Sequence, residues 1–267
     1  MTVVRSAQAA PAQLCERSIV SCGCTITSGG YYEVDASLLS TQGLTSRGEC
    51  IAIKADNVLL NLQASQISGP GGAAEGSASI GVHIQPGANN NFIEGSGALI
   101  DGWSVGLLIE GSQNDIEFFD ANNNDVAGVV LEHASGNNIT DFVANNNGEY
   151  GVWLLQSNSN QINCANADNN ASSGIYLGCS GSKNGIVGCR RNGVNTDNHL
   201  FNLMIDTNGA YGILLDSGNR HTTVSDVSAQ GNSLADLGDR NAGCGSDMWF
   251  GNSFNSVSQN CVDPTLR

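Results

Sequence analysis

The chain alternates short apolar runs with Gly-, Ser- and Asn-rich segments, and within each run the apolar residues recur at every second position. A period of two is typical of β-strands, and the runs are too short for helices with a period of 3.6. Successive runs also repeat. They follow glycines that are 25, 22, 23, 23 and 38 residues apart, at Gly81, Gly106, Gly128, Gly151, Gly174 and Gly212. The pattern predicts a repeating unit that contains two short strands.

A unit of this size cannot bury its own apolar face, but a stack of such units buries a continuous core. We therefore predict a parallel β-helix whose coils are about 4.8 Å apart. Its expected parts are an N-terminal arm or signal remnant at 1–19, a β-helix domain at 20–262 and a C-terminal tail at 263–267. The 38-residue step is about 15 residues longer than the others, which predicts an insertion near 189–207.

Asparagine recurs at fixed places in the repeat, once before the second strand of a unit and once at its far end. The positions are Asn114, Asn137, Asn160, Asn124, Asn147 and Asn170. Stacked Asn side chains hydrogen-bond along the axis of a solenoid and tolerate left-handed backbone at its bends. We interpret these residues as structural ladders.

Both ends of the chain resemble a known superfamily. The stretches CTITSGGYYEVDASL (24–38) and CIAIKADNVLLNLQASQISG (50–69) resemble the opening of secreted right-handed parallel β-helix proteins with pectate-lyase-like repeats. NSLADLGDRNAGCGSDMWFGNSFNSVSQNC (232–261) is similar to their last coil and cap. The resemblance implies an all-β, single-stranded right-handed parallel β-helix (solenoid), for which we expect about eight or nine coils.

The resemblance does not imply one activity, because the superfamily includes lyases, glycoside hydrolases, epimerases and members without a known reaction. The combined Asn-Thr-Asp, Asp-Asp, Gly-His-Gly and Arg-Ile-Lys set of the polygalacturonases is not present. The basic proton abstractor and acidic ligands of a calcium-dependent pectate lyase are not recognisable either, and the chain has only two lysines, Lys54 and Lys183.

The register of the repeat predicts which side chains point into the core and which point out. The inward positions are all aliphatic: Val82, Leu107, Val129, Val152, Ile175 and Ile213, then Ile84, Ile109, Leu131, Leu154, Leu177 and Leu215. The first outward column is His83, Leu108, Val130, Trp153, Tyr176 and Leu214. The second outward column is Gln85, Glu110, Glu132, Leu155, Gly178 and Asp216.

The first outward column is unusually apolar for a face in contact with water. Apolar surface of this size indicates a ligand, a partner or a covering segment. One interpretation is a binding platform in which Trp153 and Tyr176 stack on a sugar ring or another flat ligand. The alternatives are that the N-terminal arm or the segment 189–207 covers the face, or that it contacts another molecule. The residues expected to bind substrate are His83, Val130, Trp153, Leu155, Tyr176 and Asp216.

Glu110 and Glu132 are neighbours in the second outward column, one coil apart, so their carboxyl groups are expected to lie about 5 Å from each other. That separation suits the acid/base pair of a retaining glycosidase, a shared proton or a bound cation. His133 follows directly and is a candidate assistant if the bend turns it outward. The alternative is that both glutamates are solvated surface residues.

The charge balance limits the possible partners. The chain has 25 acidic and 10 basic residues and a net charge of −15, which disfavours nucleic acid and anionic membranes. It has no apolar run long enough to span a bilayer. A neutral glycan or a small molecule is the expected ligand, and the sequence does not indicate an oligomeric state.

Nine cysteines favour disulfides in an exported protein over a zinc site, because no CxxC pair accompanies a second pair or two histidines. The expected pairs are Cys24–Cys50 and Cys244–Cys261, with one cysteine left over. The opening SAQAAPAQ resembles the end of a signal peptide. We expect a secreted, periplasmic or extracellular protein.

These observations predict a secreted carbohydrate-active protein that cleaves a glycosidic bond in the strand-lined groove, as a polysaccharide hydrolase or lyase. Glu110, Glu132 and His133 are its candidate catalytic residues, and no metal or cofactor is expected, although calcium remains open. Two alternatives are a non-catalytic solenoid that binds a glycan or a surface component, and an enzyme acting on a small apolar molecule beneath a lid formed by 189–207.

Overall fold

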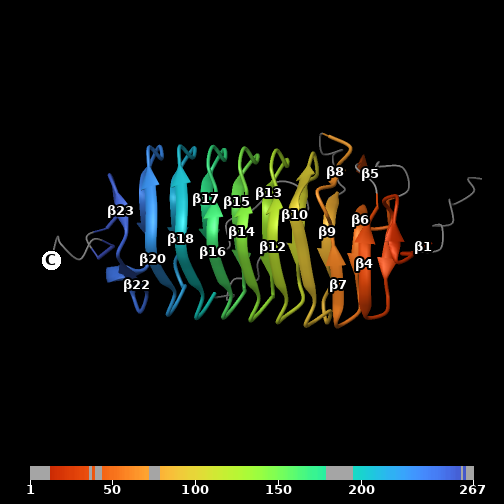
Figure 1. The fold of residues 1–267 in the computed structure, drawn as a ribbon. Coiled ribbons are helices and arrows are strands. Elements are labelled where there is room, and N and C mark those ends of the chain that lie inside the picture. Colours follow the sequence, from red (N-terminus) through yellow and green to blue (C-terminus); the bar gives the residue numbers. More distant parts are fainter. Residues whose placement is uncertain are drawn as a thin grey trace, which may run out of the picture.

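The computed structural model is a parallel β-helix in which the strands stack side by side along one axis (Figure 1). It describes residues 13–35, 38–39, 44–71, 79–178, 195–259 and 261–262. Every strand pair in these ranges is parallel, and the chain advances one coil at a time from β1 at one end to β22 and β23 at the other. The predicted all-β solenoid is confirmed.

Two sheets run the length of the described part. Sheet A has ten strands, in spatial order β1 (Gln13–Leu14), β3 (Cys24–Ile26), β6 (Glu49–Ile53), β9 (Ile80–Ile84), β11 (Val105–Ile109), β13 (Ala127–Glu132), β15 (Tyr150–Leu155), β17 (Ser173–Leu177), β19 (Tyr211–Leu215) and β21 (Ala235–Asp239). Its register pairs the residues that share a place in the sequence repeat, such as Val130 with Trp153 and Trp153 with Tyr176.

Sheet B has thirteen strands in the same described ranges. Its main path is β2 (Ser18–Ile19), β4 (Gly30–Val34), β7 (Val58–Asn61), β10 (Phe92–Asp101), β12 (Asp115–Asp120), β14 (Asn138–Val143), β16 (Gln161–Asn166), β18 (His199–Asp206), β20 (Thr223–Gln230) and β22 (Met248–Phe250). The strands β5 (Leu38–Leu39), β8 (Gln66–Ser68) and β23 (Ser253–Phe254) pair at its margin, and a short 3-10 turn, η1, covers Ala242–Cys244.

The core lies between the two sheets. All twelve predicted inward positions are buried in one continuous cluster, together with residues of sheet B such as Ile116, Phe119 and Phe142. Phe119 and Phe142, in adjacent coils, stack with ring centroids 5.2 Å apart. The period-two pattern therefore identified the buried face of sheet A correctly.

Two asparagine ladders close the turns between the sheets. In each ladder the backbone N–H of one Asn donates to the side-chain oxygen of the Asn one coil further on, at 2.9–3.0 Å for the steps from Asn114 to Asn137 and from Asn137 to Asn160. The predicted ladders are confirmed. They also extend beyond the predicted positions, to Asn198 in one ladder and through Asn208 to Asn232 in the other.

The extra residues of the 38-residue step lie between Gly178 and Asn195. Both asparagine ladders continue past this step without a shift, from Asn160 to Asn198 and from Asn170 to Asn208. Residues 199–206, which the predicted insertion included, form β18 of an ordinary coil. Of the rest of that predicted insertion, residues 195–198 and 207 belong to the same coil, and residues 189–194 lie outside the described residues. At the other end, β1 and β2 show that pairing begins before the residue-20 boundary suggested by the sequence.

Disulfides fasten both ends of the solenoid. The predicted pair Cys244–Cys261 is present. The predicted pair Cys24–Cys50 is wrong, because Cys50 bonds to Cys22 and Cys24 bonds to Cys15. The reason is register: Cys24 lies opposite Ile51 in β6, whereas the Cα atom of Cys22 is 4.2 Å from that of Cys50. Cys164 is the free cysteine of the described part, and Cys179 and Cys189 lie outside it.

Candidate functional site

The outward columns of sheet A carry a second apolar cluster, separate from the core. Val130, Trp153, Leu155 and Tyr176 all belong to it, and all are buried, with Trp153 only 2% exposed and Tyr176 only 1%. The expectation of a solvent-exposed aromatic platform is therefore wrong. The side chains point away from the core as predicted, but the outer face of this sheet is itself a packed interior.

Aromatic rings make up the centre of this second cluster. Tyr150, which precedes the predicted columns, stacks on Tyr176 with centroids 4.9 Å apart and an interplanar angle of 19°. It also lies 5.2 Å from Trp153 in a tilted arrangement. The indole N–H of Trp153 donates to the backbone carbonyl of Gly178 at 3.0 Å. Trp153 is thus a packed and hydrogen-bonded residue, and its role in binding a ligand remains a hypothesis.

The segment 189–207 does not act as a lid where the structure describes it. Residues 199–206 are β18 of sheet B, on the opposite wall of the solenoid from the apolar columns. Residues 189–194 and the N-terminal arm up to residue 12 lie outside the described part.

His83 occupies the N-terminal end of the first outward column, between two carboxylates. Its Nδ1 lies 2.5 Å from Oε1 of Glu49 in the preceding coil, and its Nε2 lies 2.7 Å from Oε2 of Glu110 in the following coil. The imidazole is 3% exposed and Glu49 is 2% exposed. Parallel register produces this arrangement, because β9 pairs with β6 on one side and with β11 on the other.

The two carboxylates favour the protonated form of His83. Burial by itself lowers the pKa of His83, but its hydrogen bonds to Glu110 and Glu49 outweigh the effect and raise the pKa above the ordinary value. For Glu49 burial favours the neutral acid, yet the bonds from His83 and Thr45 prevail and lower its pKa. Thr45 Oγ1 donates to Glu49 at 2.6 Å and Gln85 Nε2 donates at 2.8 Å. The ionised form of Glu49 is therefore favoured, with His83, Thr45 and Gln85 all in contact with its carboxylate.

Glu110 and Glu132 follow directly after paired residues, Ile109 and Leu131, so they are neighbours in adjacent coils as predicted. They differ in their surroundings. Glu110 is ion-paired with His83 and its side chain is 23% exposed. Glu132 is 12% exposed and has no ion pair as short as this among the described residues; burial first, and then the charge of Glu110, raise its pKa. The two neighbouring carboxyls therefore lie in different surroundings, one ion-paired with a buried imidazole and the other more buried.

His133 lies at the bend after β13, with a left-handed backbone (φ 53°) and an exposed side chain. Its Nδ1 is 3.9 Å from Oε1 of Glu132, which is longer than a hydrogen bond. The bend therefore turns His133 outward, beside the carboxyl pair rather than between its members.

The described residues contain no group of three or more His, Cys, Asp or Glu side chains arranged to hold a metal ion. Glu49 and Glu110 contact opposite nitrogens of His83, so the ring separates their oxygens. This arrangement is suited to holding protons rather than a cation.

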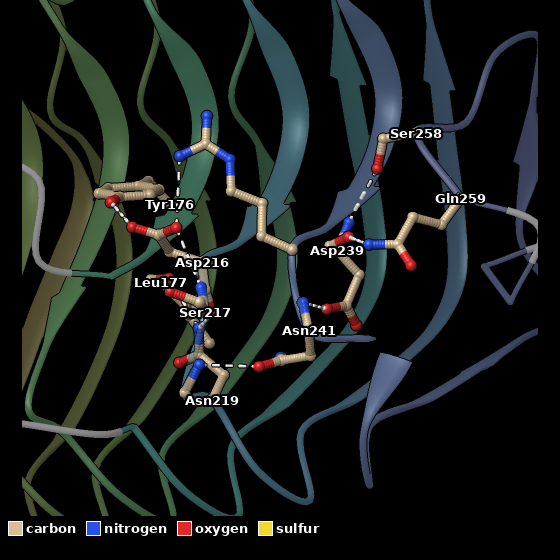
Figure 2. Close-up of polar contacts among 11 residues, drawn as sticks. Tyr176, Leu177, Asp216, Ser217, Asn219, Asp239, Asn241, Ser258 and Gln259 are labelled. Atoms are coloured by element: carbon tan, nitrogen blue, oxygen red, sulfur yellow. Dashed lines mark hydrogen bonds and ion pairs between the residues drawn. The ribbon is translucent and has the colours of Figure 1, made fainter. Parts of the chain in front are cut away.

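Asp216 lies three coils beyond Glu132 in the second outward column and forms a separate polar cluster (Figure 2). Its carboxylate accepts the hydroxyl of Tyr176 at 2.7 Å and contacts Arg240 Nη1 at 3.3 Å. Gly178 leaves the room for it, since a Cβ there would lie 2.5 Å from both Asp216 Cβ and Tyr176 Oη. Asp216 therefore joins the aromatic cluster to the C-terminal coils and does not reach the Glu110–Glu132 pair.

Sequence reasoning missed Glu49, which lies in the longer, irregular N-terminal coils before the clear repeats. A signal was present, since Glu49 immediately precedes the apolar run that starts at Cys50. Aligning that run with the repeat would have placed Glu49 on the outer face, opposite Ile80.

No protein-family model matches the chain, and no curated protein matches it. Among solved structures, the Dettilon tailspike protein superposes with a TM-score of 0.59 at 15% identity, over 88% of this chain and 54% of that one. The enzymatically active domain of tailspike protein 2 from bacteriophage CBA120 superposes with a TM-score of 0.63 at 13% identity, over 92% of this chain and 39% of that one. The chain thus spans about half the length of the first and less of the second. At such identities the likeness concerns the fold.

Proposed function

We propose that this protein cleaves a glycosidic bond of a neutral polysaccharide at the outer edge of sheet A, with Glu110 and Glu132 as the reacting carboxyls. The observation that carries the proposal is that the two carboxyls are neighbours in adjacent coils but differ in their surroundings: Glu110 is paired with His83, whereas Glu132 is more buried and has a raised pKa. Two carboxyls in unlike surroundings can divide the roles of acid and nucleophile between them.

The division of roles follows from the charges. Glu132, whose pKa is raised, donates its proton to the glycosidic oxygen as that bond breaks. Glu110, whose carboxylate is oriented by its contact with His83, attacks the anomeric carbon, and the resulting ester is then hydrolysed by water that Glu132 deprotonates. Adjacent strands are about 4.8 Å apart, close to the ~5–5.5 Å carboxyl separation of retaining enzymes. The step needs no metal or cofactor.

His83 is a positioning residue in this scheme. It fixes the orientation of the Glu110 carboxylate through Nε2, and Glu49 in turn holds the imidazole through Nδ1. Because His83 is buried, we assign it no contact with substrate. His133, on the exposed bend, is close enough to contact a sugar beside Glu132.

The location and the ligand class rest on two whole-molecule properties. Disulfides at both ends are typical of an oxidising compartment, which supports a secreted or extracellular protein. The net charge of −15 disfavours a polyanionic substrate. The described residues include no helix with the length and apolarity to cross a bilayer. The likeness in fold to an enzymatically active tailspike domain supports an enzymatic role without defining it.

The experiment that tests the proposal is a screen of neutral polysaccharides with products detected by mass spectrometry, repeated with Glu132→Gln and Glu110→Gln. We expect at least one substrate, with turnover lowered about 100-fold or more by either change, since general acid–base catalysis contributes typically 10²–10⁴-fold. Glu94→Gln, a carboxylate of sheet B that contacts Ser96, is the matched control and should keep full turnover. Full turnover in both site variants would refute the assignment.

A non-catalytic glycan-binding solenoid is the second candidate. The observation that favours it is the burial of Glu132 and of the aromatic cluster, which limits direct access to substrate. Glycan binding that persists in the absence of any product, with calcium present or removed by a chelator, would select this alternative.

A further inference from the structure

Sheet B carries a groove of about 500 Å³ on its outer surface. Its lining includes Phe118, Asp141, Cys164, Asn166, Asn202 and Met204, which come from four consecutive coils. The core separates this groove from His83 and the carboxyl pair, because those residues lie on the outer face of sheet A.

A column of left-handed residues forms one side of the groove. Phe118, Asp141, Cys164 and Asn202 occupy the same place in successive coils, with φ between 49° and 58°. Each of these residues interrupts the pairing between neighbouring strands. For example, Glu117 pairs with Thr140 and Phe119 with Phe142, while Phe118, which lies between them, is unpaired. The sheet therefore bends along this column, and its side chains stand out from the surface beside the next outward column, which contains Asn166 and Met204.

The lining combines apolar surface with unused hydrogen-bonding capacity. Phe118 is 46% exposed and Met204 58% exposed, both large values for apolar side chains. Asp141 and Asn202 are exposed, so their carboxylate and amide groups are accessible to a ligand in the groove. The side-chain oxygen of Asn166 lacks a partner within the described residues, but it is buried and does not face the open groove.

The charges and polar groups together select a class of ligand. Asp141 is the only charged side chain among the described residues of the lining, so an anionic ligand is disfavoured. A purely apolar ligand would remove water from the Asp141 carboxylate without replacing its hydrogen bonds. Neutral sugars present both an apolar ring face, which packs on aromatic rings, and hydroxyl donors. Four adjacent coils extend over roughly 14 Å, longer than a single sugar ring.

We propose that this groove is a non-catalytic binding site for a neutral oligosaccharide. Phe118 and Met204 supply the apolar contacts, and Asp141 and Asn202 bind the hydroxyl groups. The proposal rests on the proposed function only for the choice of sugar as ligand class. A second binding surface on the opposite wall would keep the protein on a polymer independently of catalysis, which raises the effective concentration of chain at the carboxyl pair.

Cys164 provides a local test, because it lies in the groove and is not in a disulfide. The folded protein is treated with N-ethylmaleimide in the presence of maltohexaose, cellohexaose or chitohexaose, and labelling of the peptide that contains Cys164 is measured over time by mass spectrometry. We expect at least one hexasaccharide to slow the labelling fivefold or more.

Two variants assign the effect to the groove. Phe118→Ala and Asp141→Ala should each remove the protection, whereas Phe250→Ala should retain it, since Phe250 is a similarly exposed aromatic residue of sheet B outside the groove. Circular dichroism confirms that each variant is folded. The proposal is overturned if no hexasaccharide protects Cys164 or if Phe118→Ala leaves protection unchanged. Protection that grows with protein concentration without sugar would identify a second copy of the chain as the occupant and also overturn it.

Glu132→Gln separates this proposal from the proposed function. Protection of Cys164 that persists while no glycan is cleaved contradicts only the catalytic assignment. If glycan cleavage persists but no sugar ever protects Cys164, only the proposed binding of oligosaccharide in the groove is contradicted.

Discussion

At the scale of single residues, the decisive feature is a buried charge that its neighbours keep ionised. His83 and Glu49 are both nearly inaccessible to solvent. The charged form of His83 is favoured by Glu110 and Glu49, and that of Glu49 by His83 and Thr45. Removing one partner from a buried ion pair leaves an uncompensated charge in the interior, which is more damaging than replacing the whole pair.

His83→Gln therefore tests the pair through stability and its pH dependence. We expect a loss of about 3–5 kcal/mol near pH 6, measured by urea unfolding. The raised pKa of His83 stabilises the fold fully below about pH 6.5, and the effect fades as the pH rises through that pKa. The lowered pKa of Glu49 stabilises the fold above about pH 4.5, and the effect fades as the pH falls through that pKa. The loss should thus be greatest between these limits.

His133→Gln is the control for this experiment. Its exposed side chain predicts a change within about 0.5 kcal/mol at any of these pH values. A His83→Gln variant as stable as the parent protein at pH 6 would contradict the buried ion pair.

At the scale of the elements, the asparagine ladders secure each turn to the next. The Asn147 side-chain oxygen accepts the backbone N–H of Asn124 at 2.9 Å, and its Nδ2 donates to Ala121 and Asn170. At the C-terminal end of this ladder an acidic residue replaces the amide: Asp236 accepts the N–H groups of Asn232, Asn255 and Ser256. A carboxylate ends the ladder well because it accepts several bonds and donates none.

Asn147→Ala should destabilise the protein by about 2–3 kcal/mol, because the buried N–H of Asn124 and the carbonyl of Ala121 lose their partner. Thermal unfolding followed by circular dichroism measures the loss. Gln161→Ala, an exposed position of β16, should shift the midpoint little. Equal shifts of the unfolding midpoint in both variants would show that the asparagine ladder does not contribute to stability.

At the scale of the whole molecule, each coil contacts its neighbours and little else, so stability is distributed along the axis and the ends are the places where unfolding begins. The disulfides lie at these places. Cys15–Cys24 and Cys22–Cys50 fasten the first coils, and Cys244–Cys261 fastens the last.

Replacing Cys22 and Cys50 together by serine should lower stability by about 3–4 kcal/mol on the chain-entropy estimate for a loop of 28 residues. Hydrogen exchange should show that protection is lost in β3 and β6 and retained in β13 and β15. Uniform loss over all coils would indicate that the solenoid unfolds as a single unit.

Much of this architecture could be predicted from the sequence. Repeat length, alternation and Asn spacing predicted the parallel solenoid, the inward columns and the ladders, because all three depend on local periodicity and on stacking of neighbouring coils. The same register correctly placed Glu110 beside Glu132. The prediction of a disulfide between Cys24 and Cys50 was wrong, because the irregular first coils have no repeat from which the strand register can be derived.

What the tertiary structure alone decided is the environment of each outward residue. The alternation predicts that Trp153 and Tyr176 point away from the core, but not that these side chains are buried on the outer face as well. It places His83 on a column without revealing that Glu49, 34 residues earlier, lies against it. Periodicity is a property of one strand and its register, whereas burial and pKa depend on every group that packs around a side chain. The sequence alone therefore determined the direction of these side chains, and only the folded molecule determined their surroundings.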